Sequence, residues 1–364
     1  MGINSGNALQ REISIRAERV RSYLRSREYS ERFLPEHICD SVYSYINLGG
    51  KSLRPVALLW ACGAAGGSED EAIPAAAAIE AYHTWTLIHD DVIDKDAKRR
   101  GGATVHEEFR QRAVKELSYD EASARHYGLS IAILAGDILQ GWSTALLSEL
   151  STKGNVDPDV TIFLIQELAL RVQGTLVEGE TLDIQYSRYP LDLLNEDLIV
   201  RMLWKKTGAL YEFAGMAGAL IGLGLPSPTH KLVRAISAFA GKCGIAFQLQ
   251  DDILGIVGQE ELLGKPIGSD IREGKRTVIM YHALKRANDR QRAALLEVLG
   301  NEHALENDVR DVQGLLRQLG AIEYTKKLAR SYGEEATQHL DSVPVSQYTD
   351  LLYAWADLMI ERDF

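Results

Sequence analysis

The sequence predicts an all-α fold, and three features of the 364-residue chain support this prediction. Only nine prolines occur, and residues 75–157 contain none, so a long stretch lacks the residue that breaks helices most strongly. The dipeptides Asn-Gly and Asp-Gly, which mark tight hairpins, are absent from the sequence. Apolar residues recur at spacings of three and four over residues 160–177 and 348–360, which is the period of a helix with a buried face.

The expected helices are separated by breaks at residues 48–50, 63–68, 152–158, 187–192, 224–229 and 257–275. None of these breaks has the length or the Gly, Ser and Pro content of an interdomain linker, so we expect one domain over residues 1–364. Residues 1–34, which are rich in Arg and Glu, are expected to add a solvent-facing helix. Residues 285–364 are expected to add helices that carry no diagnostic motif.

Composition argues against several kinds of partner. The chain has 40 Lys and Arg against 51 Asp and Glu, a formal net charge of −11, so it lacks the basic surface that nucleic acids and anionic lipids require. Its three cysteines, Cys39, Cys62 and Cys243, fit neither a disulfide framework nor a zinc site. The most apolar run, residues 213–225, is shorter than the about 20 residues of a membrane span. The N-terminus has no apolar signal segment, so we expect a cytoplasmic protein that is not an integral membrane protein.

The first chemical signal is the acidic segment LIHDDVID at residues 87–94, which lies among apolar residues. Positions four apart share one face of a helix, so Asp90 and Asp94 are expected to project together, with Asp91 beside them. Three carboxylates this close repel one another unless a cation neutralises them, and Mg²⁺ prefers such oxygen ligands. The alternative is an acidic helix surface without a ligand, because strings of this kind are common.

A second acidic pair, Asp251 and Asp252, lies in the apolar run FQLQDDILG, 251 − 90 = 161 positions after Asp90. Two acidic pairs inside apolar helices are less easily explained by chance than one. We expect the two acidic helices to face each other across an apolar cleft with Mg²⁺ ions between them. Such a cluster of ions needs a polyanionic ligand, and a diphosphate is the obvious candidate.

Basic residues interleave with both acidic segments, in the stretches Gly49-Gly50-Lys51-Ser52-Leu53-Arg54, Arg99-Arg100-Gly101, Lys206-Thr207, Gly264-Lys265 and Gly274-Lys275. Glycine lets the backbone approach a phosphate closely, and the guanidinium fork matches its oxygens. Each stretch alone is more often a turn or a surface charge. His83 lies seven residues before Asp90, about two helical turns, and so shares its face. The ordinary alternative for His83 is a polar residue at the edge of a core.

Together these segments resemble the trans-polyprenyl diphosphate synthases, the head-to-tail chain elongases of isoprenoid metabolism. The resemblance is carried by GGKSLRP, EAYHTWTLIHDDVIDKDAKRRG, FQLQDDILG and GKPIGSDIREGKRT, in that order between residues near 35 and 284. It implies an isoprenoid synthase helical bundle around a deep central cavity, usually as a homodimer. No Ser-His-Asp or Cys-His arrangement and no phosphate-binding P-loop competes with this interpretation.

The resemblance also implies a role for each motif residue. Three Mg²⁺ ions are expected to bind the aspartates of the two motifs: Asp90, Asp91, Asp94 and Asp251, with Asp252 beside the last. The allylic diphosphate matches Arg99, Lys206, Gln248, Lys265 and Lys275, with Thr207 next to Lys206. Isopentenyl diphosphate matches Lys51, Arg54, His83 and Arg100.

The reaction that the resemblance implies suits these residues. Cations stabilise the charge that builds on the departing pyrophosphate, so the allylic C–O bond ionises. The isopentenyl double bond attacks the carbocation, and loss of a proton leaves a chain five carbons longer. The allylic substrate is expected to be dimethylallyl, geranyl or farnesyl diphosphate. A dry cavity protects the cation, and residues 213–225 are a candidate wall of that cavity.

Two positions depart from the family pattern. Gly255 stands where many members carry a third aspartate, and Glu180 stands where glutamine is frequent. Trp85 lies five residues before Asp90, about 7.5 Å along the helix, toward the expected cavity floor. A bulky aromatic here resembles the short-chain members, so we expect the C20 product geranylgeranyl diphosphate. The C15 product or a longer chain is the alternative, and ordinary core packing is the alternative role of Trp85.

Two other functions remain open from the sequence. A terpene cyclase ionises the same substrates without condensing two of them, and it has no use for the isopentenyl diphosphate residues. A non-catalytic subunit of a heteromeric synthase is expected to lose aspartates, whereas this chain keeps those of both motifs.

Overall fold

The structure, a computed structural model, describes residues 5–258 and 268–360. The regular secondary structure of these residues is helical apart from two strands of two residues each. The all-α prediction is therefore confirmed. The expected breaks at residues 48–50, 63–68, 152–158, 187–192 and 224–229 all coincide with ends of helices. The helices expected over residues 160–177 and 348–360 are present as well.

The chain divides into two compact units. Unit 1 comprises Met1–Leu168, Met216–Val233 and Val345–Leu351, and unit 2 comprises Ala169–Gly215, Arg234–Pro344 and Leu352–Phe364. The single domain that the sequence leads us to expect over residues 1–364 stays a prediction.

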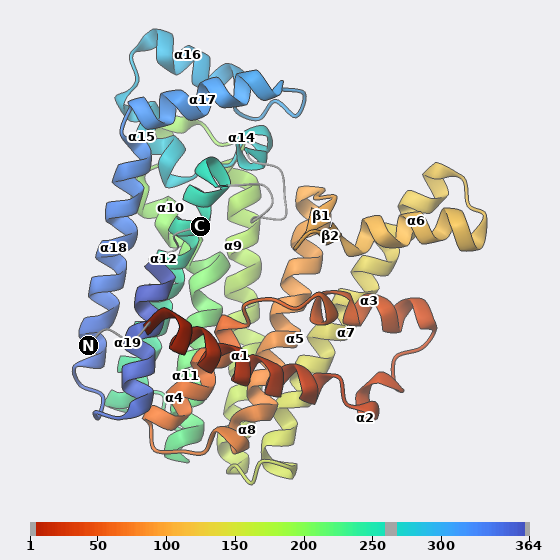
Figure 1. Cartoon of the computed structure of the whole chain (residues 1–364), viewed down its shortest axis with the longest axis vertical. Coiled ribbons are helices and arrows are strands. Elements are labelled where there is room, and N and C mark those ends of the chain that lie inside the picture. The colour runs from red at the N-terminus through yellow and green to blue at the C-terminus, as the bar shows by residue number, and fades with distance from the viewer. Residues whose placement is uncertain (1–4, 259–267, 361–364) are drawn as a thin grey trace. The chain divides into compact units, whose positions relative to one another are not determined.

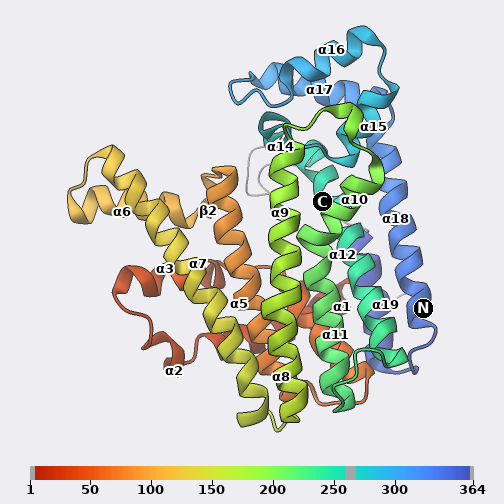
Figure 2. The ribbon, with the colours of Figure 1, turned by 180° about the vertical axis from the view of Figure 1, so that it is seen from behind.

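Unit 1 is built on a pair of long helices (Figure 1). Its elements are α1 (Ser5–Leu24), α2 (Arg27–Ser30), α3 (Glu36–Leu48), α4 (Leu53–Ala64), α5 (Glu69–Asp94), β1 (Lys98–Arg99), β2 (Gly102–Ala103), α6 (Val105–Leu117), α7 (Glu121–Thr152) and α8 (Pro158–Gln166). The helices α5 and α7 lie side by side in both views of the ribbon (Figures 1 and 2). The serine hydroxyl of Ser68 caps α5 by accepting the backbone N–H of Asp70 at 3.3 Å, and the Asp120 carboxylate caps α7.

The N-terminal helix α1 is packed on one face, so the prediction of a solvent-facing helix is wrong for that face. Ile13, Val20 and Leu24 are buried against unit 1. Arg16 and Arg19 both bind Glu69, which belongs to the acidic first turn of α5. Arginines that suggest a solvated helix in the sequence therefore pair with carboxylates at the N-terminus of another helix, where negative charge is favoured.

A short hairpin follows α5. Lys98 pairs with Ala103 and Arg99 with Gly102, and the turn residues Arg100 and Gly101 have φ of 53° and 77°. Positive φ at both central residues is the requirement of a type I′ hairpin turn. This hairpin forms without Asn-Gly or Asp-Gly, because Arg-Gly adopts the same backbone here.

Unit 2 holds the second half of the motifs. Its elements are α9 (Gln173–Tyr186), η2 (Leu191–Leu193), α10 (Glu196–Leu203), η3 (Trp204–Gly208), α14 (Ser269–Glu273), α15 (Val278–Arg286), α16 (Asp289–Val298), α17 (Glu306–Gln318) and α18 (Ala321–Leu340). Elements with residues in both units are η1 (Glu167–Val172), α11 (Ala209–Leu223), α12 (Lys231–Val257) and α19 (Gln347–Ile360). The helices expected in residues 285–364 are thus present as α15 to α19.

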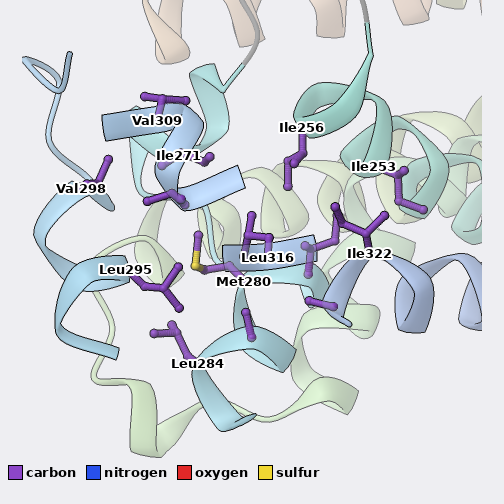
Figure 3. Close-up of a cluster of buried hydrophobic side chains, with 14 of the residues drawn as sticks. Ile253, Ile256, Ile271, Met280, Leu284, Leu295, Val298, Val309, Leu316 and Ile322 are labelled. Atoms are coloured by element: carbon purple, nitrogen blue, oxygen red, sulfur yellow. The ribbon is translucent and has the colours of Figure 1, made fainter. Parts of the chain in front are cut away.

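A hydrophobic cluster holds the end of α12 in unit 2 (Figure 3). Ile253 and Ile256 of α12 pack with Ile271, Met280 and the buried side chains of α16 to α18. Because Asp251 and Asp252 directly precede Ile253, this cluster fixes the segment that carries the second acidic pair.

Three helices within the described residues are long and apolar enough to cross a membrane, by length and composition only. They span Glu121–Thr152, Pro158–Tyr186 and Lys231–Val257. In Lys231–Val257, 72% of the most apolar window is buried inside the fold. The sequence-based view that the protein is not an integral membrane protein stays a prediction.

Candidate active site

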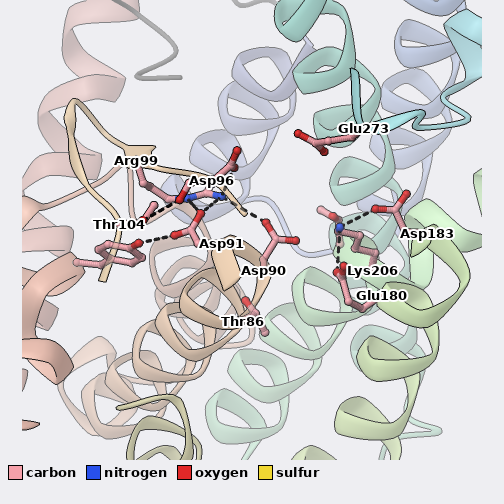
Figure 4. Close-up of polar contacts among 12 residues, drawn as sticks. Thr86, Asp90, Asp91, Asp96, Arg99, Thr104, Glu180, Asp183, Lys206 and Glu273 are labelled. Atoms are coloured by element: carbon pink, nitrogen blue, oxygen red, sulfur yellow. Dashed lines mark hydrogen bonds and ion pairs between the residues drawn. The ribbon is translucent and has the colours of Figure 1, made fainter. Parts of the chain in front are cut away.

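In unit 1, the aspartates at the end of α5 gather around one arginine (Figure 4). Asp91 is fully buried, and it accepts hydrogen bonds from the Tyr45 hydroxyl and from Arg99 Nε at 2.5 Å. Arg99 Nη2 also lies 3.3 Å from Asp90 and 3.4 Å from Asp96. The hairpin that follows α5 therefore places the guanidinium of Arg99 next to the carboxylates at the end of α5.

Burial raises the pKa of Asp91 to about 6, although the Arg99 charge and the hydrogen bonds from Arg99 and Tyr45 act in the opposite direction. One arginine thus does not fully offset the cost of burying this carboxylate. A second cation at the same place is electrostatically favoured. The donor set of α5, which is made of hard carboxylate oxygens, suits Mg²⁺.

Three of the residues that the sequence assigns to isopentenyl diphosphate, Arg54, His83 and Arg100, are brought together in unit 1. Arg54 Nη1 lies 3.1 Å from His83 Nε2. Arg100 donates to the backbone oxygens of Gly49 and of Tyr45, the latter at 3.1 Å. Lys51 is exposed in the same turn, between Gly50 and Ser52. The turn before α4, the middle of α5 and the hairpin thus bring Arg54, His83 and Arg100 together in one cluster of side chains, which we call the cationic pocket.

His83 is uncharged in this pocket. Burial lowers its pKa well below the usual range, and the positive charges of Arg54, Arg100 and Arg99 lower it further. Because Arg54 donates to Nε2, the ring proton sits on Nδ1, which lies 3.3 Å from the Thr86 hydroxyl. In this arrangement His83 orients the Arg54 guanidinium.

In unit 2, two of the predicted lysines share one aspartate. Lys206 Nζ and Lys275 Nζ each lie 2.8 Å from Asp183 Oδ2. Lys206 also lies 2.9 Å from Glu180 (Figure 4). Burial acts to raise the pKa of Asp183, but the two lysines outweigh it and the pKa lies below its usual range. Glu180, the departure noted in the sequence, thus adds a second negative charge to Lys206.

A second row of polar contacts in unit 2 joins Thr207, Gln248 and Asp252. The Thr207 hydroxyl donates to Gln248 Oε1 at 2.8 Å, and Gln248 Nε2 donates to Asp252 Oδ1 at 2.9 Å. These three predicted residues therefore lie together. The amide of Gln248 connects the π-helical segment η3 to the acidic pair of α12.

The donor set around Asp252 also suits a divalent cation. Asp252 is buried, and its Oδ2 has no hydrogen-bond partner. Burial raises the pKa of Asp252 well above its usual range, and the nearby charges of Asp270, Asp183 and Asp251 raise it further. A Cβ added at Gly255 would lie 3.1 Å from Asp270 Oδ2, so Asp270 places a carboxylate next to the position where other members carry an aspartate.

Among the residues that the structure describes, no group of three or more His, Cys, Asp or Glu side chains is placed to hold a metal ion as it stands. Asp90 and Asp91 of α5 instead bind Arg99, and Asp183 binds Lys206 and Lys275. Lys265 lies outside the described residues. The expectation that the two acidic pairs face each other stays a prediction.

Two backbone features place Lys206 and Thr207. Both residues belong to η3, which has π-helical geometry, and such segments often mark functional sites. A Cβ at Gly179 of α9 would lie 2.3 Å from the Lys206 backbone nitrogen, so α9 and η3 touch backbone to backbone. This close approach brings Lys206 within reach of Glu180 and Asp183.

Trp85 is largely buried on α5, with a T-shaped contact to Tyr82 at 4.8 Å between ring centroids. Its indole N–H donates to His89 Nδ1 at 3.0 Å. The indole is therefore held on two sides.

Sequence reasoning missed several residues at these sites, namely Tyr45, Asp96, Asp183 and Asp270. Tyr45 and Asp183 lie far in sequence from the groups they bind, so no local spacing marks them. Asp96 and Asp270 stand inside the recognised segments, at residues 80–101 and 264–277, where they are further carboxylates.

Comparison with known proteins gives a consistent result. The family model described as polyprenyl synthetase matches residues 35–316. The geranylgeranyl diphosphate synthase of Saccharolobus solfataricus is 33% identical over 310 residues, 85% of each chain. The geranylfarnesyl diphosphate synthase of Aeropyrum pernix is 32% identical over 335 residues, 90% of this chain and 95% of its own.

Solved structures agree with the sequence matches. A geranylgeranyl pyrophosphate synthase from Corynebacterium glutamicum, complexed with isoprenyl diphosphate and magnesium, superposes with a TM-score of 0.85. The alignment covers 98% of this chain and 99% of that one, at 27% identity.

Proposed function

The chain belongs to the polyprenyl synthetase family of prenyltransferases, and we propose that it condenses isopentenyl diphosphate with an allylic diphosphate, giving geranylgeranyl diphosphate as product. The observation that carries the proposal is the arrangement around α5. Arg99 lies on Asp90 and Asp91, and a separate cationic pocket of Arg54, His83 and Arg100 lies in the same unit. Two anion sites with different partners are what a two-substrate condensation requires.

We propose that Mg²⁺ binds the aspartates of both motifs, as three ions on Asp90, Asp91, Asp94, Asp251 and Asp252. The raised pKa of Asp91 and the unpartnered, buried Oδ2 of Asp252 support this assignment. When bound, magnesium supplies positive charge that stabilises the departing pyrophosphate. A related synthase is complexed with magnesium and isoprenyl diphosphate, which supports the same role here.

The chain's own cations complete the allylic diphosphate site in this proposal. Lys206 and Lys275 donate to Asp183, and the oxygens of a diphosphate are charged acceptors that suit the same ammonium groups. Thr207 and Gln248 orient one another, and Arg99 is held in position by Asp91. We extend the same role to Lys265 from the motif alone.

The isopentenyl diphosphate site is assigned to Lys51, Arg54, His83 and Arg100. Neutral His83 accepts a hydrogen bond from Arg54 Nη1 at its Nε2 and thereby orients the guanidinium. Arg100 is fixed by the backbone oxygens of Tyr45 and Gly49. The pocket thus holds the nucleophilic substrate while the allylic bond ionises.

Product length is assigned to Trp85, whose indole is held by Tyr82 and His89. Relatives of nearly equal similarity are named for C20 and C25 products, so overall similarity does not decide the length. The bulky indole of Trp85, which is held in place five residues before Asp90 on α5, supports the C20 product over the C25 product. Incubating the enzyme with dimethylallyl and isopentenyl diphosphates and sizing the products by mass spectrometry tests this. We expect C20 from the native chain and longer products from Trp85→Ala; a native product of C30 or more contradicts the proposal.

Magnesium-dependent release of pyrophosphate by the purified chain tests the reaction itself. Removing the metal with a chelator, or making Asp90→Asn or Asp251→Asn, is expected to lower kcat by about 10²-fold or more, because a charge-stabilising group is lost. Asp192→Asn, an exposed aspartate outside both motifs, is the control and is expected to keep native activity. Release without consumption of isopentenyl diphosphate would identify a terpene cyclase instead. No release by the chain alone, with activity after a partner is added, would identify a non-catalytic subunit.

We further propose a cytoplasmic homodimer. Ile133 and Leu134 on α7 are about half exposed, at 48% and 49%. Adjacent exposed apolar side chains on a long helix are typical of a protein interface. A second copy of the chain is the partner we assign to this face.

A further inference from the structure

A row of polar side chains in unit 1 lies next to the cationic pocket and takes no part in the assignments above. The Ser52 hydroxyl donates to Glu80 Oε1 at 3.1 Å and accepts from Arg21 Nη1 at 3.4 Å. Ser52 and Glu80 are both buried, with 8% and 5% of their surfaces exposed. The row joins three elements: α1, the turn before α4, and α5.

Ser52 has a backbone conformation that its side chain must support. It adopts the left-handed region with φ 46° and ψ 39°, which is unfavourable for a residue with a Cβ. Although it occupies the N-cap of α4, its hydroxyl caps no backbone N–H of that helix and binds Glu80 instead. The hydrogen bond to Glu80 therefore stabilises the conformation of the turn. Lys51 precedes Ser52 in this turn, and Arg54 follows it.

The same turn is held on its other side by Arg100. A Cβ added at Gly50 would lie 2.6 Å from Arg100 Nη2, so the guanidinium lies directly against the glycine backbone. Arg100 also donates to Gly49 and Tyr45 oxygens. Arg100 itself adopts a positive φ of 53°. Two residues with left-handed backbones thus meet at one pocket, and each is fixed by hydrogen bonds.

Glu80 has a second property that the hydrogen bond to Ser52 does not explain. Its Oε2 is buried and has no hydrogen-bond partner, which is costly for a carboxylate. Its negative charge acts on Arg100, where burial lowers the pKa and Glu80 provides the largest opposing charge. Glu80 therefore places one negative charge next to the cationic pocket. In that pocket the positive charges of Arg54, Arg99 and Arg100 lower the pKa of His83.

We infer that Ser52 and Glu80 are positioning residues of the isopentenyl diphosphate site, and that Arg21 of the N-terminal helix supports them. They fix the turn that presents Lys51 and Arg54, and they touch no substrate. The inference rests on the proposed function, because that proposal assigns Lys51, Arg54, His83 and Arg100 to isopentenyl diphosphate. It gives the N-terminal helix a part in substrate binding.

Steady-state kinetics with both substrates varied tests the inference. Ser52→Ala and Glu80→Ala are expected to raise the KM for isopentenyl diphosphate about fivefold, the effect of one net hydrogen bond. The allylic KM and kcat are expected to stay within about twofold, since the row contacts neither Asp90 nor Asp91. Glu80→Gln keeps an oxygen acceptor for Ser52, so its KM is expected to remain near or below the native value. Arg21→Gln is expected to give a smaller rise than Ser52→Ala.

Arg19→Gln is the matched control, because Arg19 lies on the same helix but binds Glu69 and Asp70 instead of Ser52. Thermal melting confirms that each variant is folded, and if Glu80→Ala does not fold, Ser52→Ala and Arg21→Gln decide the question. Unchanged KM for isopentenyl diphosphate in the folded variants, an equal rise in both KM values, or an equal effect of Arg19→Gln would overturn the inference. A native enzyme that consumes no isopentenyl diphosphate would instead overturn the proposed function.

Discussion

Asp183 is the carboxylate that pairs with Lys206 and Lys275 in unit 2. It is almost fully buried, and two ammonium groups lie 2.8 Å from one of its oxygens. Removing one partner of a buried ion pair leaves the other charge uncompensated, which costs about 3–5 kcal/mol. The lysines proposed to bind the allylic diphosphate are thus placed by a carboxylate that no local sequence pattern marks.

We therefore expect Asp183→Asn to lower the free energy of unfolding by about 3 kcal/mol, measured by urea denaturation. The exposed Asp192→Asn is expected to change it by less than about 0.5 kcal/mol. Added pyrophosphate is expected to stabilise Asp183→Asn more than the native chain, because it restores negative charge next to Lys206 and Lys275. Equal stabilisation of both proteins would contradict this role of Asp183.

His83 predicts a pH dependence of stability. Burial and three arginines hold its pKa well below 6.5, so the unfolded chain takes up a proton below about pH 6.5 that the folded chain does not. The contribution of His83 to the free energy of unfolding is therefore lost as the pH falls below that value, by at most about 1.4 kcal/mol per pH unit.

His83→Gln removes this contribution, so the stability of the native chain relative to the variant is expected to fall between pH 7 and pH 5. Urea denaturation at each pH measures the difference. His126→Gln, which makes the same substitution at an exposed histidine, is the matched variant for comparison. A constant difference for His83→Gln would mean that the pKa of the ring is the same in the folded and the unfolded chain.

At the scale of the helices, glycines decide how closely two elements pack. A Cβ added at Gly218 of α11 would lie 2.2 Å from the Leu58 backbone oxygen in α4, and one at Gly222 would lie 2.3 Å from the Cys62 oxygen. The backbones of α11 and α4 are therefore in direct contact at Gly218 and Gly222. Backbone atoms of α4 cannot move aside for an added Cβ as a flexible side chain can.

Gly218→Ala is expected to destabilise the chain by about 1–3 kcal/mol through this overpacking, as measured by the shift of the urea midpoint. Gly141→Ala provides the matched control, since Gly141 lies within α7 and nothing surrounds its added Cβ within 4 Å. There the better helix propensity of alanine is expected to stabilise by about 1 kcal/mol. The same sign for both variants would refute the packing argument.

The helices themselves could be predicted from periodicity and breaks, because those signals are local. The buried face of α1 could not, since Arg16 and Arg19 look solvated until the acidic turn of α5 lies opposite them. The motif aspartates and arginines could be found from their spacing and resemblance. Partners such as Tyr45 and Asp183 depend on which helices become neighbours, and that information is spread over the whole sequence.

At the scale of the whole molecule, the proposed homodimer predicts a concentration-dependent assembly. The exposed pair Ile133 and Leu134 is expected to lie at the contact between two copies. Ile133→Lys places the same charge on both copies, so light scattering is expected to give a monomer mass for this variant and a dimer mass for the native chain. Val345→Lys, at a position that is 93% exposed, is the control and is expected to remain dimeric. A native monomer would contradict the proposal.

The π-helical segment η3 has a consequence for how this chain can change over evolutionary time. A π-helical turn arises when one extra residue is accommodated in an α-helix, and here it carries Lys206 and Thr207. Losing a single residue anywhere in Trp204–Gly208 would return the segment to regular α-helix and swing every later side chain by about 100°. A one-residue deletion in η3 is therefore expected to break the hydrogen bond between Thr207 and Gln248.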